Sequence, residues 1–243
     1  MTSGELIWTR PEPGGRRPKF TRAQIAQAAL EIADAEGFAA VSMRRIAGEL
    51  GAGTMTLYYY VRTKDELVAL MDDAIMGEVL IPSDELPSHW YDALCAIAIR
   101  TWDVLMHHPW SLHSLQNAQA GPNAMRHFEQ SLAALAGTTL DAPGKFALLS
   151  MVDDYVHGNV LRSAEVQAGG SDTEMADEVM RFAQEQFASG EFPHTQALYD
   201  GGDPQEVFGR LLGGRSARDR FRYGLAVLLD GAAARMKLPL PGS

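Results

Sequence analysis

Residues 42–61, SMRRIAGELGAGTMTLYYYV, constrain the fold more than any other stretch, because a turn with two glycines divides them into two short segments. Ser42 can cap a first helix, with Ile46, Ala47 and Leu50 on its inner face. Gly51 suits the left-handed conformation in which helices commonly end. A second short helix is predicted over Thr54–Tyr60. Two short helices joined by such a turn predict a helix-turn-helix.

Longer helices are predicted on both sides of this motif. Thr21 with Gln24, and Thr63 with Glu66, have the spacing of capping boxes. The first box opens a helix that runs to Gly37. In a helix-turn-helix, the second helix is the one that enters the major groove of DNA. The N-terminal region is therefore predicted to be a three-helix DNA-binding domain.

Three consecutive tyrosines lie on the predicted second helix. Successive helical residues are about 100° apart, so Tyr58, Tyr59 and Tyr60 would fan over most of its circumference. Leu57 and Val61 would hold the inner face, and at least one tyrosine should be exposed. Exposed aromatic rings with hydroxyl groups suit a polar partner better than a dry core.

The net charge of −10 hides an asymmetry along the chain. Residues 1–64 hold nine Lys/Arg against six Asp/Glu, a balance of +3, while the remainder holds 12 against 25, a balance of −13. A basic N-terminal region on an acidic body can approach a phosphate backbone if the body faces away. A solvated basic arm is the alternative explanation.

The run from Thr21 through Leu70 resembles the DNA-binding domain of the tetracycline-repressor (TetR) family. The resemblance is carried by GFAAVSMRRIAGELG followed by TLYYYVRTKDEL. Two positions depart from the family pattern: Tyr60 stands where the family often has histidine, and Val61 where it often has phenylalanine.

The resemblance implies that Arg44, Thr54, Met55 and Tyr58 lie near base edges, and that Thr56, Tyr59, Tyr60 and Lys64 contact phosphates. The chemistry of these side chains agrees, because arginine can bridge guanine O6 and N7, methyl groups can meet a thymine methyl, and hydroxyl or ammonium groups can hold phosphate oxygens. The alternatives are that Tyr58 packs on the first helix and that Lys64 only begins a solvated helix.

Three regions are predicted from composition. Residues 1–19 are expected to be a flexible basic arm, in which Arg16, Arg17 and Lys19 either become ordered on a duplex or stay disordered. Residues 20–80 are the helix-turn-helix domain. Residues 81–243 are the ligand-binding and dimerisation domain that the resemblance implies.

The body shows helical periodicity and no sustained period-two alternation, so the expected fold class is all-α. Helices are predicted over residues 90–107, 111–119, 122–136, 143–167, 173–189 and 217–236, with a less ordered stretch, FPHTQALYDGGDPQ, before the last. The helix over 143–167 is apolar on more than one side and is expected to be central. The resemblance implies that it and the last helix pair with a second copy, giving a homodimer that reads a palindromic operator.

A small-molecule effector site is predicted where bulky apolar side chains and isolated polar groups coincide on the body helices. The alternative for each residue is an ordinary place in the core. The candidates are Trp102, Met106, Trp110, His113, Met125, Phe128, Met151, Tyr155 and Asn159.

Other sites are not expected. His107, His108 and His113 suggest a metal site, but adjacent histidines on a helix point about 100° apart and no cysteine accompanies them. Neither a metal nor another cofactor is therefore predicted.

The single cysteine, Cys95, lies in an apolar run and should be buried. No segment has the length and apolarity of a membrane span or signal peptide, so a cytoplasmic protein without a membrane partner is expected.

The sequence is consistent with three functions. The first is a ligand-responsive one-component transcriptional regulator, in this family most often a repressor. The second is a helical enzyme, since Asp153, Asp154, Tyr155 and His157 include acid/base groups, although no nucleotide, nucleophile or metal motif accompanies them. The third is a DNA-binding dimer with no ligand.

Overall fold

The chain is almost entirely helical in the computed structural model, which describes residues 6–13, 20–112, 121–168, 173–199, 207 and 215–242. No strand occurs within those ranges, and the expected all-α class is confirmed. The helices are α1 (Arg22–Glu36), α2 (Met43–Glu49), α3 (Thr54–Leu57), α4 (Lys64–Val79), α5 (Trp90–His107), α7 (Pro122–Ala134), α8 (Ala142–Ala168), α9 (Thr173–Ala188), α10 (Pro193–Tyr199) and α12 (Ala217–Met236). Short 3₁₀ turns lie at η1 (Ile7–Thr9), η2 (Phe38–Ala40) and η3 (Pro109–Ser111).

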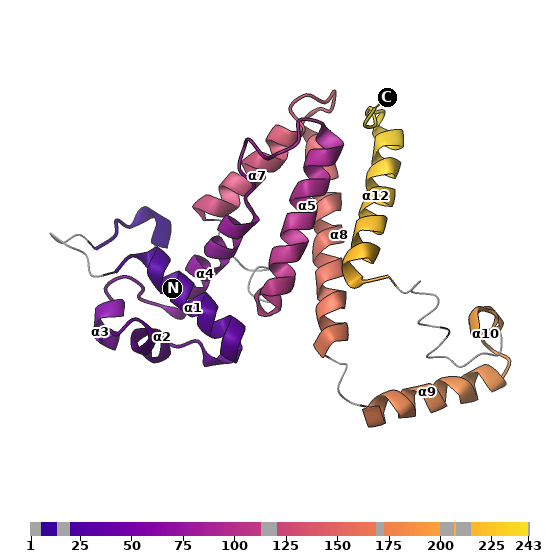
Figure 1. The fold of residues 1–243 in the computed structure, drawn as a ribbon, viewed down its shortest axis with the longest axis horizontal. Coiled ribbons are helices and arrows are strands. Elements are labelled where there is room, and N and C mark those ends of the chain that lie inside the picture. Colours follow the sequence, from indigo (N-terminus) through magenta and orange to yellow (C-terminus); the bar gives the residue numbers. More distant parts are fainter. Residues whose placement is uncertain are drawn as a thin grey trace.

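Helices α1, α2 and α3 form a head at one end of the molecule, and α4 connects this head to the body (Figure 1). In the body, α5 packs against α8, α8 packs against α12, and α7 packs against α4 and α5. Helices α9 and α10 extend away from the end of α8 (Figure 1). The helix-turn-helix is thus held at a distance from the α8–α12 pair.

The helix ends follow the local sequence closely. Thr21 and Gln24 form the predicted capping box, and the Ser42 hydroxyl accepts a hydrogen bond from the backbone N–H of Arg45. Gly51 has φ +60°, the left-handed conformation predicted for the end of α2. The box at Thr63 is only half formed, because the Glu66 carboxylate accepts from the backbone N–H of Arg62 instead of Thr63.

Part of the expected flexible arm packs on the head. Ile7 is buried, and Arg10 forms an ion pair with Glu66 of α4 at 2.8 Å. The buried guanidinium of Arg22 donates hydrogen bonds to the carbonyls of Ile7 (2.9 Å) and Arg10 (2.7 Å). The expectation of flexibility is therefore wrong for residues 6–13. Arg16, Arg17 and Lys19 lie outside the described residues.

Two body segments also differ from expectation. The stretch predicted to be less ordered contains α10. Helix α8 has one buried stripe, formed by Leu148, Val152, Val156 and Val160, while Phe146 and Leu161 are exposed. Within one chain α8 is therefore buried along a stripe, and its packing partners are α5 and α12.

No helix in the described ranges combines the length and the apolarity that a membrane crossing requires.

Candidate nucleic-acid interface and ligand site

The head exposes a polar and aromatic surface along α2, α3 and the turn after α3. Met55 is 74% exposed and Tyr59 73% exposed, and Tyr58 is also exposed. Thr54 and Thr56 are half-buried on the same short helix. These side chains project outward because Leu57 and Val61 are fully buried and fix the opposite face.

The two arginines of α2 differ in their surroundings. Arg45 is held by Glu36 at 2.7 Å and by Glu49 at 2.8 Å, so two carboxylates neutralise its charge. Arg44 is exposed and has no hydrogen-bond or ion-pair partner among the residues that the structure describes. Arg44 is therefore the arginine of this pair that is available to a duplex.

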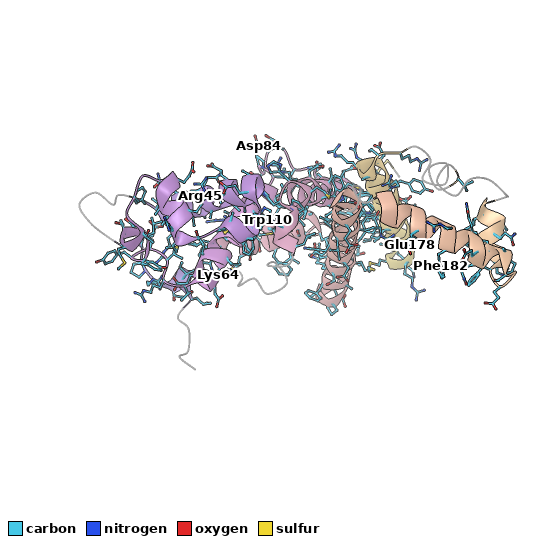
Figure 2. All side chains as sticks on the ribbon, turned by 90° about the horizontal axis from the view of Figure 1, so that it is seen from below. Arg45, Lys64, Asp84, Trp110, Glu178 and Phe182 are labelled. Atoms are coloured by element: carbon cyan, nitrogen blue, oxygen red, sulfur yellow. The ribbon has the colours of Figure 1, made fainter. Side chains whose placement is uncertain are left out.

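Lys64, the first residue of α4, is exposed (Figure 2). Its Nζ lies 5.5 Å from the centre of the Phe38 ring. The ring fixes the side chain from one side and leaves the ammonium group accessible to solvent. This placement is compatible with the predicted phosphate contact.

Tyr60 does not share the outward face. Its side chain is 5% exposed and belongs to the head core, and its carbonyl accepts hydrogen bonds from Arg10 and Arg22, each at 3.3 Å. Helix α3 ends at Leu57, so the helical spacing that would have fanned the three tyrosines does not extend to Tyr60. The expectation that Tyr60 contacts phosphate is corrected: Tyr60 is a core residue.

Tyr59→Phe and Tyr60→Phe are expected to differ. Each change removes only a hydroxyl group. If the Tyr59 hydroxyl donates a hydrogen bond to a phosphate oxygen, its loss should weaken DNA binding by about 1.5–3 kcal/mol, which is the range for hydrogen bonds to charged groups. The melting temperature of the protein should not change. Tyr60→Phe should leave DNA affinity unchanged. Fluorescence anisotropy with labelled duplex measures both, and equal losses of affinity would contradict the assignment.

In the body, three of the predicted ligand residues come together around Phe221 of α12. Trp102 and Tyr155 each stack on this ring, with centroid distances to Phe221 of 5.5 and 5.4 Å. The Trp102 indole N–H donates to the Asn159 side-chain oxygen at 2.9 Å, and the Tyr155 hydroxyl donates to the Phe221 carbonyl at 3.0 Å. Their polar atoms are satisfied within the chain, which favours a packing role for this group.

The remaining candidates are dispersed. Met125, Phe128 and Met151 are exposed on α7 and α8, and Met106 is partly buried against the core. Trp110 lies at the junction of head and body, where its ring stacks on Phe38 at 5.4 Å and its N–H donates to Asp34 at 2.8 Å (Figure 2). The structure therefore does not place Trp110 with Trp102 and Tyr155. His113 lies outside the described residues.

His127 on α7 is a candidate that the sequence analysis missed. Its Nδ1 is buried without a hydrogen-bond partner in the described part of the chain. Burial, and to a smaller extent the nearby charge of His157 on α8, lowers the pKa of its imidazole to about 4. The ring is thus neutral at physiological pH and keeps one free hydrogen-bonding nitrogen. The sequence around His127 does not mark it as a site residue. The group on α8 that acts on it, His157, is distant in sequence.

Comparison with known proteins gives two matching families. Residues 25–71 match the family described as bacterial regulatory proteins, tetR family, and residues 82–236 match the family described as tetracyclin repressor-like, C-terminal domain. Together these matches span the head and the body.

Individual proteins are similar over nearly the whole chain. The HTH-type transcriptional repressor DrrR1 of Streptomyces coeruleorubidus is 34% identical over 235 residues, covering 93% of this chain and 83% of that protein. An HTH-type transcriptional regulator of Saccharopolyspora erythraea is 35% identical over 212 residues, covering 84% of this chain and 86% of that protein.

Among solved structures, the TetR family protein ActR of Streptomyces coelicolor in complex with (S)-DNPA has a TM-score of 0.65 at 25% identity, covering 89% of this chain and 98% of that chain. ActR has also been solved in complex with actinorhodin. The first two of these relatives are named regulators of transcription, and ActR is named a TetR family protein.

Proposed function

The chain belongs to the TetR family of transcriptional regulators, and we propose from this premise that it is a repressor that binds a palindromic operator as a homodimer and is released by a small organic molecule. The regulated DNA would lie in the cytoplasm, where the protein would also meet its effector. The effector itself would be largely apolar.

The observation that carries the DNA-binding proposal is the unpartnered outward face of the helix-turn-helix. The guanidinium of Arg44 is not paired with a carboxylate of the described residues. The side chains of Met55 and Tyr59 are mostly exposed and therefore do not contribute to the core of the head. Such a face matches the needs of base readout and phosphate contact, since a duplex offers acceptors in the major groove and anionic oxygens beside it.

The proposal of a homodimer is supported by the outer side of the α8–α12 pair. Phe146 and Leu161 of α8, and Tyr223 and Val227 of α12, are all exposed in the single chain. Tyr223 and Val227 are one helical turn apart, so they share a face. A second copy would cover these side chains around a twofold axis, and two heads would then face the two halves of a palindrome.

The proposal of an effector is supported by the surroundings of His127. A neutral imidazole on α7, whose Nδ1 has no partner among the described residues, can exchange a hydrogen bond with a hydroxyl or carbonyl group of a ligand. On the same helix, Met125 and Phe128 are exposed and supply adaptable apolar surface. The complexes of ActR are with organic ligands by their descriptions, which agrees with an effector of this kind.

An effector found by thermal-shift screening of aromatic compounds should bind more weakly when operator DNA is present. Linkage requires that the two ligands weaken each other by the same factor, and a coupling of about 1–3 kcal/mol is typical. Calorimetric titration with and without duplex measures this factor.

The variant His127→Leu should weaken the effector and leave DNA binding without effector unchanged. His194→Leu is the matched control, because His194 is exposed on α10. Equal effector affinity with and without DNA would contradict release by an effector.

A further inference from the structure

A buried histidine lies where the head meets the body. His108, directly after α5, is 2% exposed. Its Nδ1 lies 2.8 Å from Asp34 Oδ1 of α1, and its Nε2 lies 3.3 Å from Glu78 Oε2 of α4. A neutral imidazole carries one N–H and can donate to only one of these two carboxylates. Both contacts are favourable only if each ring nitrogen carries a proton, or if a metal cation takes the place of one of these protons.

His107 brings a second imidazole to the same place. Helix α5 ends at His107, and His108 has φ −115° and ψ 58°, which is not helical. The two adjacent rings therefore meet, with centroids 4.8 Å apart and planes at 78°. The argument that adjacent histidines must diverge does not hold here, because it assumes that both residues are helical.

Together these groups form a cluster of metal-ligand type. One ligand atom each from Asp34, His107 and His108 can be chosen so that all lie within 4.8 Å of one another. Zn²⁺ bonds to imidazole nitrogen and carboxylate oxygen are about 2.0–2.2 Å long, so tetrahedral ligand atoms are roughly 3.3 Å apart. Asp34 and His107 are both exposed, and small rotations of their side chains would close this difference.

The surroundings supply the outer partners that metal-binding histidines usually have. With a metal at Nδ1 of His108, the Nε2–H is free to donate to Glu78, which reproduces the carboxylate–histidine–metal arrangement. Trp110 donates to the Asp34 carboxylate at 2.8 Å and restricts its orientation. Both partners come from elements that pack at the same junction, which Figure 2 marks by the label of Trp110.

We propose that Asp34, His107 and His108 bind a divalent transition-metal ion, with Zn²⁺ as the best match to two imidazoles and one carboxylate. Water fills the fourth position. The ion joins α1 of the head to the end of α5 in the body. This inference goes beyond the proposed function, since binding of the metal requires neither operator nor effector.

The test uses untagged full-length protein, freed of metal by dialysis against a chelator, and Co²⁺ as a spectroscopic probe. One equivalent of Co²⁺ per chain should produce the visible absorption bands of a tetrahedral site, and Zn²⁺ should displace it. His107→Ala should abolish the bands, and because His107 is exposed, its circular dichroism spectrum should match that of the parent. His194→Ala, which removes an exposed histidine far from the cluster, should bind Co²⁺ as the parent does.

Two further measurements separate this site from adventitious binding to surface histidines. Glu78→Gln keeps all three ligands and should weaken Zn²⁺ binding by about 10–100-fold, the usual effect of removing an outer partner. Zn²⁺ should raise the melting temperature of the parent and not of His107→Ala, since a ligand of the folded state stabilises it. The proposal is overturned if no tetrahedral Co²⁺ bands appear, or if His107→Ala binds Co²⁺ as tightly as His194→Ala.

Discussion

Leu57→Ala is expected to lower the free energy of unfolding by about 2–5 kcal/mol, the range for a large-to-small change in a packed core. Leu57 is fully buried at the end of the four-residue helix α3. A helix this short has little stability of its own and depends on such packing. Urea denaturation followed by circular dichroism measures the change.

Met55→Ala is the matched control for this substitution. Met55 lies on the same helix but is 74% exposed, so its loss leaves no cavity and should change stability by less than about 0.5 kcal/mol. Similar destabilisation by the two variants would mean that α3 is not anchored through Leu57.

Arg44→Ala and Lys64→Ala are expected to weaken DNA binding in different ways. Loss of a bidentate arginine contact to guanine should cost about 1–3 kcal/mol on the preferred duplex and relax the preference at that base. Loss of a lysine that contacts phosphate should weaken all sequences alike and flatten the dependence of affinity on salt. Anisotropy titrations on preferred and scrambled duplexes at several salt concentrations separate the two effects.

Arg45→Ala controls for the removal of a positive charge from α2. Arg45 is paired with Glu36 and Glu49, so its loss should affect DNA affinity far less than the loss of Arg44. The assignment fails if Arg44→Ala and Lys64→Ala reduce affinity equally on every sequence, or if Arg45→Ala has the larger effect on base preference.

The junction of head and body shows a contiguous set of contacts. Lys64 lies over Phe38, Phe38 stacks on Trp110, and Trp110 shares the Asp34 carboxylate with His108. Helix α4 also carries Lys64 at its first turn and Glu78 at its last. A displacement of the body relative to α4 would therefore act on the end of α4 opposite Lys64, for which a phosphate contact is predicted.

The starts of α1 and α2 and the end of α2 were predictable because their determinants are local. The cap at Ser42, the box at Thr21 and the left-handed Gly51 each involve residues within a few positions of one another. The half-formed box at Thr63 was not predictable, since Glu66 is drawn away by Arg10, which is distant in sequence. Local rules fail where a distant partner competes for the same atom.

The interpretation of the sequence failed for residues that follow the end of a helix and for a residue whose partners are distant in sequence. Tyr60 and His108 were both placed by helical spacing, yet each lies just after its helix has ended, so the first is buried and the second meets its neighbour. Trp110 was assigned to the body interior, but its partners Asp34 and Phe38 come from the head. The predicted base and phosphate contacts of the other head residues stay predictions.

The most direct test of the central claim is selection of bound sequences from a random pool of duplexes by the purified protein. We expect a palindrome whose half-site centres are separated by one helical turn, about 34–36 Å, or a multiple of it, because one helix-turn-helix per chain in a twofold dimer presents two recognition helices. Enrichment of a single unrepeated half-site, or no enrichment over the starting pool, would contradict the account.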